Sequence, residues 1–68
     1  MYYVVAANGP RYTVLAGPYQ THKEASAMVD KVRRVAYRIN PMAVFYTFGT
    51  CRLIGYNKPG LFNRRGLI

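Results

Sequence analysis

Two stretches rich in β-formers, separated by a turn signal, give the start of the chain the pattern of a β-hairpin. Residues 2–7 are rich in tyrosine and valine, which favour a pleated strand. Asn8-Gly9 follows, and this pair suits the positive backbone angles of a tight hairpin turn. The strand pattern resumes over residues 11–16, whose successive side chains point to opposite faces. The pattern therefore predicts two antiparallel strands, and the Gly17-Pro18 pair is expected to end the second.

One helix is predicted from residue 22 to residue 39. Thr21 with Glu24 three residues later forms a capping-box pattern, which places the first helical residue at His22. The Asn40-Pro41 pair ends the helix, because the residue before a proline is pushed out of the helical region. Apolar side chains recur within this helix at intervals of three, four and seven, and the stripe is expected to face the core: Ala25, Met28, Val29, Val32, Ala36 and Ile39.

Residues 43–54 are rich in β-formers and are interrupted only by Gly49. A single glycine in a strand pattern indicates a bulge or a bend, so the segment is either one long bent strand or two short ones. Residues 56–60 have the composition of a turn. Together with the short apolar and arginine-rich stretch after it, this turn is predicted to form a basic C-terminal arm over residues 56–68.

The order strand, strand, helix, strand favours an α+β fold. We expect an antiparallel sheet of three or four strands with one helix packed on one face, in the order ββαβ or ββαββ. The chain of 68 residues is short enough to form a single small domain, residues 1–68. Because one helix covers one face, the other face of the sheet is expected to stay open. A homodimer formed through this open face or through an edge strand is one hypothesis.

The composition excludes several classes of protein. Hydrophobic residues make up 51% of the chain, which predicts a folded domain. The apolar runs are far shorter than the roughly 20 residues that span a bilayer, and no secretory signal opens the chain, so no membrane partner is expected. The single cysteine, Cys51, cannot form an internal disulfide. These features predict a cytoplasmic protein.

Residues suited to catalysis are scarce. His22 is the only histidine and falls in the first turn of the predicted helix. Glu24 is expected to cap that helix and Asp30 to lie on its surface, so no pair of carboxylates is left for acid–base chemistry. Cys51 has no histidine or acid to activate it and is expected to be structural. We therefore predict no enzymatic activity, no catalytic residue, no metal ligand and no cofactor.

Positive charge is the feature that points to a partner. The formal net charge is +8, and residues 1–30 are neutral overall, whereas residues 31–68 contain eight basic side chains and no acid. Seven of the ten basic residues are arginine, which pairs with phosphate or carboxylate through two parallel hydrogen bonds. Segregated charge of this kind indicates a binding surface for an anionic partner. The candidate contacts are Lys31, Arg33, Arg34, Arg38, Arg52, Lys58, Arg64 and Arg65.

Aromatic residues add a second candidate feature. Rings are frequent in the predicted strands, and alternation leaves about half of the strand side chains on the uncovered sheet face. Aromatic rings beside cations can stack on unpaired bases, and Tyr37 and Tyr46 are the candidates for this role. The same rings are also expected where a small domain fills its core, or where an open face packs against another protein.

Two resemblances to known proteins extend these expectations. Residues 12–34, a strand ending in Gly-Pro-aromatic followed by a helix with basic residues late, are similar in outline to half of the sporulation-related repeat, a peptidoglycan-binding α/β domain. The whole chain resembles short uncharacterised proteins of tailed bacteriophages in residues 16–19, residues 45–50 and the Lys58-Pro59-Gly60 turn. This second resemblance implies a mobile-element accessory protein that acts on host machinery in the host cytoplasm.

The sequence therefore predicts a small basic nucleic-acid-binding accessory protein, which contacts phosphates through a helix face and a C-terminal arm. The alternative is a phage-encoded inhibitor or adaptor that binds an acidic host protein through the same cations and exposed aromatic residues. The pattern leaves open whether the nucleic acid would be DNA or RNA.

Overall fold

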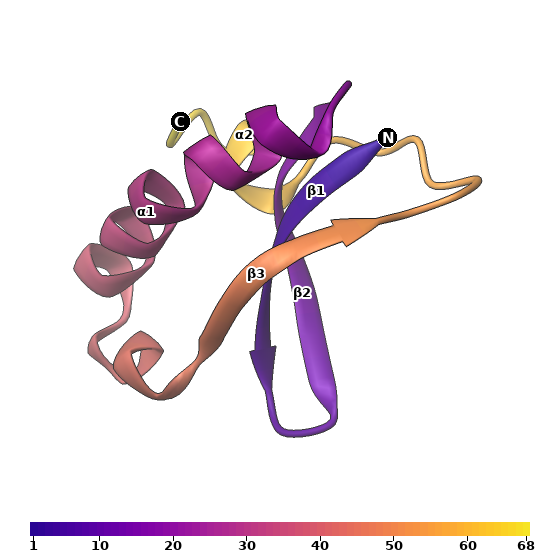
Figure 1. Cartoon of the computed structure of the whole chain (residues 1–68). Helices are drawn as coiled ribbons and strands as arrows, with labels where there is room; N and C mark the ends of the chain where they lie inside the picture. Colours follow the sequence, from indigo (N-terminus) through magenta and orange to yellow (C-terminus); the bar gives the residue numbers. More distant parts are fainter.

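The central strand of the sheet is β1, Tyr2–Asn8, in a computed structural model that describes residues 1–68 (Figure 1). It is flanked by β2, Arg11–Tyr19, and by β3, Thr47–Arg52, in the order β2-β1-β3 with both pairs antiparallel. The outer sides of β2 and β3 are therefore the two edges of the sheet. The remaining elements are α1, His22–Ile39, a 3₁₀ helix, Pro41–Phe45, and α2, Leu61–Arg64. The expected α+β class is confirmed, with three strands.

The β1–β2 hairpin forms as predicted but differs in detail. Asn8 pairs with Arg11, so Gly9 and Pro10 are the central residues of the turn, and Gly9 takes the positive φ of 62°. The second strand does not end at Gly17-Pro18 as expected. Gly17 and Pro18 lie at an irregularity in the pairing between β2 and β1. The strand continues to Tyr19, which pairs with Tyr2.

The segment predicted as strand over residues 43–54 is divided. Its first part belongs to the 3₁₀ helix, which Asn40 starts by accepting the Met42 N–H on its side-chain oxygen at 3.0 Å, with Pro41 in the first helical position. This local start overrides the β-propensity of the residues that follow. Of the bulge or bend expected at Gly49, the bulge is absent, because pairing between β1 and β3 runs unbroken from Arg52 to Thr47.

Helix α1 begins where the capping pattern predicts. Thr21 Oγ1 accepts the backbone N–H of Glu24 at 3.1 Å. The apolar stripe packs on the sheet through buried Ala25, Val32 and Ala36 and the partly buried Met28 and Val29. Its last member is an exception, since 54% of Ile39 is exposed where the helix end leaves the sheet.

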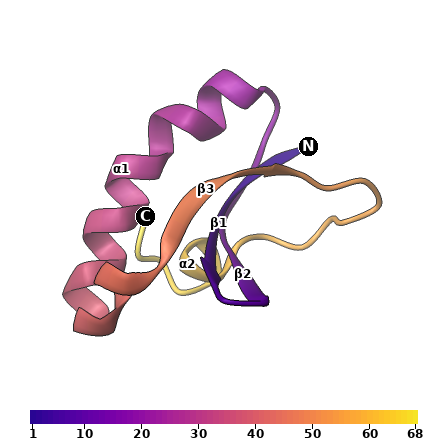
Figure 2. The same cartoon turned by 60° about the horizontal axis from the view of Figure 1, so that its bottom comes forward.

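The C-terminal segment is part of the core and does not form the expected arm. Phe62 of α2 is buried in one cluster with Val4, Leu15 and Val32, and Ile68 packs against that cluster. Helices α1 and α2 therefore cover the same face of the sheet (Figures 1 and 2). Arg64, Arg65 and Leu67 remain exposed, whereas Leu61, Phe62 and Ile68 supply core that α1 leaves unfilled over β2.

Close backbone contact holds this segment against β2. Gly60 is buried, and a Cβ on it would lie 2.5 Å from the carbonyl carbon of Leu15. Its N–H donates to the Gly17 carbonyl at 3.1 Å, and the Gly17 N–H donates to Asn63 Oδ1 at 2.9 Å. Both backbone hydrogen-bonding groups of Gly17 are thus used by residues more than forty positions later in the chain.

The opposite face of the sheet is covered at one end only. Tyr3 is completely buried there, with its ring edge-on to Tyr56 at 5.1 Å and its hydroxyl donating to the Tyr56 carbonyl at 3.1 Å. The other strand side chains on this face are small apart from Val5, Val14 and Tyr12, and Tyr12 is 62% exposed. The expected row of exposed rings is therefore reduced to a single tyrosine. Homodimerisation through this face stays a prediction.

Burial of Tyr3 makes the stability of the protein sensitive to alkaline pH. Burial, with a smaller contribution from Tyr56, raises the pKa of Tyr3 above its ordinary value of 10.0. The unfolded chain therefore loses this proton at lower pH than the folded protein. The free energy of unfolding should be fully retained below pH 10 and should fall as the pH rises through the folded pKa.

Urea denaturation followed by circular dichroism between pH 7 and pH 11 measures this loss. Tyr3→Phe keeps the ring but lacks the ionising group, so its free energy of unfolding should decline less steeply with pH. Parallel decline in the two proteins would contradict this assignment. Burial also raises the pKa of Tyr19, so some alkaline dependence is expected to remain in the variant.

Neither helix combines the length and apolar character that crossing a membrane requires.

Candidate nucleic-acid interface

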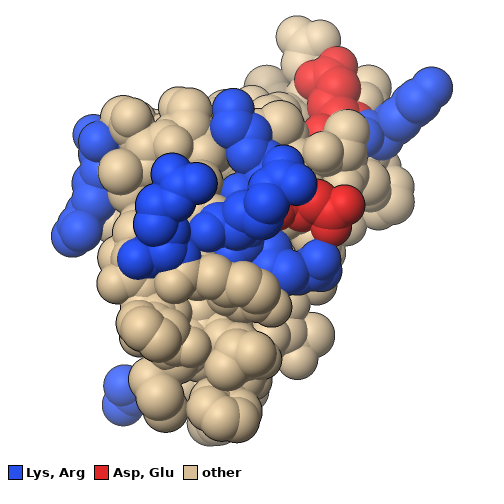
Figure 3. All heavy atoms as spheres, turned by 90° about the vertical axis from the view of Figure 1, so that its left-hand side faces the viewer, with Lys and Arg blue, Asp and Glu red and all other residues tan.

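Three cations lie together on the solvent side of α1. Lys31, Arg34 and Arg38 are all exposed, and their spacing of three and four residues places them on one helix face. We call this set the α1 cationic face. It extends for about 10 Å along the helix axis at a rise of about 1.5 Å per residue. Figure 3 shows Lys and Arg side chains gathered across the middle of the surface that α1 presents.

Arg33 has a different environment from its neighbours. Its Nη1 donates to Asp30 Oδ1 at 2.9 Å, which is the only ion pair in the protein. Its guanidinium also lies 5.8 Å from the centre of the Phe48 ring. Arg33 is therefore held between α1 and β3 and is partly neutralised. The three residues of the α1 cationic face have no such acidic partner.

The structure does not bring Arg52 and Lys58 to this face. Arg52 ends β3 and pairs with Tyr2, whose ring contacts that of His22 at 5.8 Å at the start of α1. From His22 to Arg38 the helix rises about 24 Å. Lys58 lies in the loop over residues 53–60, which projects away from α1 (Figure 2). The sequence alone does not show that Arg52 and Lys58 lie away from the α1 cationic face.

Arg64 and Arg65 lie neither on the α1 cationic face nor as far from it as Arg52 and Lys58 do. Both are exposed at the end of α2, on the side of the sheet that α1 also covers. They are fixed by the buried Phe62 rather than carried on a free arm. The eight predicted contacts thus separate into the α1 cationic face, the constrained Arg33, the α2 pair and two distant residues.

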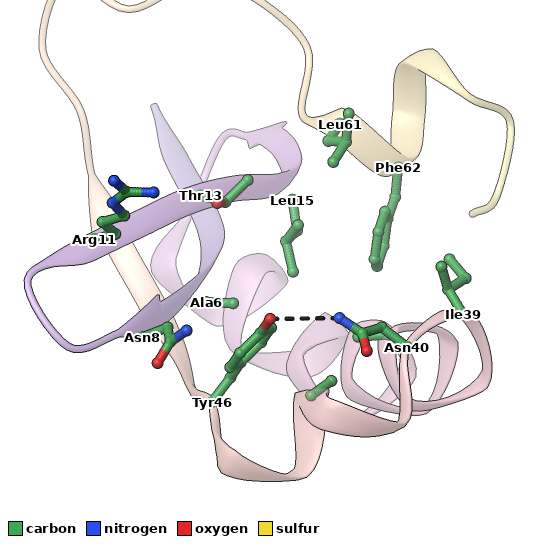
Figure 4. A pocket seen from close by; sticks show the side chains of 12 residues that line it. Ala6, Asn8, Arg11, Thr13, Leu15, Ile39, Asn40, Tyr46, Leu61 and Phe62 are labelled. Atoms are coloured by element: carbon green, nitrogen blue, oxygen red, sulfur yellow. Dashed lines mark hydrogen bonds between the residues drawn. The ribbon is translucent and has the colours of Figure 1, made fainter.

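The two residues predicted to stack on bases lie in different surroundings. Tyr37 is 40% exposed, and its ring packs edge-on against Phe48 at 6.0 Å between centroids. Tyr46 instead points into a cavity on another side of the protein, where its hydroxyl accepts from Asn40 Nδ2 at 3.4 Å (Figure 4). Tyr46 is therefore not a stacking residue of the α1 face.

An exposed apolar group was missed by the sequence reasoning. Met42, Val44 and Phe45 point outward from the 3₁₀ helix, and Phe45 is 73% exposed. We call them the apolar corner. In Figure 3 the surface below the gathered cations is tan, in keeping with this placement next to the end of α1. The sequence signal for this arrangement was Asn40-Pro41, because this pair starts a short helix. The residues that follow are turned outward by that helix and do not continue a strand.

His22 has structural contacts. Its Nε2 is hydrogen bonded to Thr50 Oγ1 at 3.0 Å and lies 3.4 Å from Ser26 Oγ, so the ring ties the first turn of α1 to β3. Cys51 is a free, partly buried thiol. No group of three or more histidine, cysteine or acidic side chains is placed to hold a metal ion.

No protein family, curated protein or solved structure matches this chain. The resemblances to bacteriophage proteins and to the sporulation-related repeat therefore stay predictions.

Proposed function

We propose that this protein binds nucleic acid through phosphate contacts made by the α1 cationic face. The observation that carries this proposal is the set of three exposed cations on one side of a single helix with no carboxylate paired to any of them. Along about 10 Å of its axis, one strand of duplex DNA carries about three phosphates. The length and charge of the face therefore match a short run of backbone.

The other basic residues support this interaction at longer range. Arg64 and Arg65 extend positive charge on the same side of the sheet. The net charge of +8 attracts a polyanion to the whole molecule and raises the association rate. Tyr37 and Phe45 offer exposed rings near the end of α1, where unpaired bases can stack. Contact with phosphate is nevertheless the main source of affinity in the proposal.

Salt dependence tests this function directly. Three phosphate contacts predict a log–log slope of affinity against salt of about −2.7 for duplex DNA and about −2 for a single strand. Fluorescence anisotropy with labelled 20-residue oligonucleotides measures both slopes. Arg34→Gln and Arg38→Gln should each reduce the magnitude of the slope by about 0.9 on duplex DNA.

Arg52→Gln is the matched control. It removes one positive charge at the end of β3, near the first turn of α1 and away from the α1 cationic face. It should lower affinity slightly and leave the slope almost unchanged. Equal effects of Arg34→Gln and Arg52→Gln would show that net charge, rather than the α1 cationic face, determines binding. Absence of binding to any oligonucleotide at about 50 mM salt would overturn the proposal.

The apolar corner favours a second candidate function, an inhibitor or adaptor that docks on an acidic protein. Methionine and aromatic residues are enriched in the cores of protein interfaces, and Met42 and Phe45 are both exposed here. For a phage-encoded protein the partner would be a host protein. Retention of a partner from nuclease-treated lysate by the wild type, and its loss in Phe45→Ser, would favour this candidate over nucleic-acid binding.

A further inference from the structure

A cavity of about 370 Å³ lies between α2, the end of α1 and the β1–β2 hairpin (Figure 4). The cavity opens to solvent, since Arg11, Thr13 and Ile39 of its lining are exposed. Its volume is within the range of roughly 300–1,000 Å³ that is typical of small-molecule sites. Most of its lining is apolar.

The polar side chains of the lining are arranged unevenly. Asn8 and Arg11 are paired across the hairpin, and Thr13 follows Arg11 on the same strand face. Figure 4 shows these three at the hairpin end of the cavity, with Leu61, Phe62 and Ile39 at the other end. Asn40 is the one polar side chain of the lining beside Ile39, so the polar groups are concentrated at the hairpin end without being confined to it.

The hairpin end of the cavity is positively charged. Arg11 is the only charged residue of the lining, it is exposed, and it makes no ion pair. Its guanidinium lies at the rim and turns outward in Figure 4, so a flexible side chain is free to close over a ligand. No acidic residue is present that would accept an amine.

Tyr46 supplies a second polar group between the two ends. Its ring points into the cavity, and its hydroxyl oxygen accepts from Asn40 Nδ2 at 3.4 Å. The phenolic proton itself is donated to no group of the protein. A hydrogen-bond donor is thus aimed into a largely apolar space, where it would meet an acceptor oxygen.

We infer that this cavity binds a small amphipathic carboxylate. The carboxylate lies at the hairpin end against Arg11, and the hydrocarbon part lies between Phe62, Leu61 and Ile39. This site is separate from the α1 cationic face, and the inference goes beyond nucleic-acid binding. A molecule with the same hydrocarbon part and a positive head group is excluded by the same charge.

Three probes with eight carbons each and different head groups test the inference: octanoate, octanol and octylamine. Titration into ¹⁵N-labelled protein should shift the amide signals of residues lining the cavity. Octanoate is expected to saturate with a Kd of about 1 mM or lower, and octanol to bind about tenfold more weakly because it lacks the charged hydrogen bond. Octylamine should produce no saturable shift.

Two variants locate the site. Arg11→Gln should reduce octanoate affinity about tenfold and leave octanol unaffected, whereas Arg52→Gln, with the same loss of charge elsewhere, should change neither. Ile39→Trp places a larger ring at the exposed rim and should abolish binding of both probes while the circular dichroism spectrum is retained. Equal binding of octanoate and octylamine, equal effects of the two arginine variants, or shifts confined to the apolar corner would each overturn the inference.

Discussion

Phe62→Ala is expected to remove most of the stability of this protein. The ring is 5% exposed and fills the part of the core between α1, α2 and β2. Truncating a buried phenylalanine to alanine costs about 3–5 kcal/mol. The single core of a chain this short rarely supplies more than about 3–5 kcal/mol of stability, so a large fraction of the molecules should be unfolded at 25 °C.

Urea and thermal denaturation followed by circular dichroism measure this change. Leu67→Ala is the matched control, because Leu67 lies in the same segment but is exposed. It should shift the free energy of unfolding by less than about 0.5 kcal/mol. A Phe62→Ala protein that unfolds at the same urea concentration as the wild type would show that the C-terminal residues do not belong to the core.

Gly60→Ala is expected to separate the C-terminal segment from β2. The added Cβ would meet backbone atoms of Leu15 and Ala16 at 2.5 Å, and backbone cannot move aside as a flexible side chain can. The hydrogen bonds that Gly17 makes with Gly60 and Asn63 would be lost or lengthened. We expect a loss of about 3 kcal/mol, at the upper end of the usual cost of overpacking.

Gly49→Ala provides the comparison for this variant. A Cβ at Gly49 has no atom within 4 Å, and its φ is not positive, so alanine fits without strain. Its free energy of unfolding should stay within about 0.5 kcal/mol of the wild type. Hydrogen exchange of the β2 amides would locate the effect, since Gly60→Ala should deprotect residues near Gly17 and Gly49→Ala should not.

These two glycines show why the C-terminal part of the fold was not predictable. Gly60 follows Lys58-Pro59 and has the composition of a turn, but its role is close approach to a strand far away in the chain. Gly49 interrupts a strand pattern and suggests a bulge, but it lies in regular pairing. The meaning of a glycine depends on what packs against it, and a single sequence carries no record of that partner.

Signals from residues close together in the sequence predicted the structure more reliably than single glycines did. The Thr21 cap and the spacing of Ala25, Val32 and Ala36 predict α1 and its buried face, because a helix is specified by residues within a few positions of one another. The one-turn helix α2 is too short to show a periodic pattern, so Phe62 could not be identified as a core residue.

The same distinction applies to the candidate site. Lys31, Arg34 and Arg38 belong to one helix, and their common face follows from their spacing. Arg52 and Tyr46 lie on other elements, and their positions depend on how the strands and the 3₁₀ helix are arranged in space. Within the candidate site, the common face of one helix was predicted, whereas the positions of residues on other elements required the structure.

The place of β3 at the edge of the sheet has a consequence for the behaviour of the protein in solution. Its outward peptide groups, from Thr47 to Arg52, have no neighbouring strand and form a template on which another chain can add. Two copies that approach along this strand each carry a formal charge of +8 and repel one another. Sulfate or phosphate ions screen this repulsion, so purification in such buffers would favour filamentous or oligomeric material, whereas dilute monovalent salt would keep the chains apart.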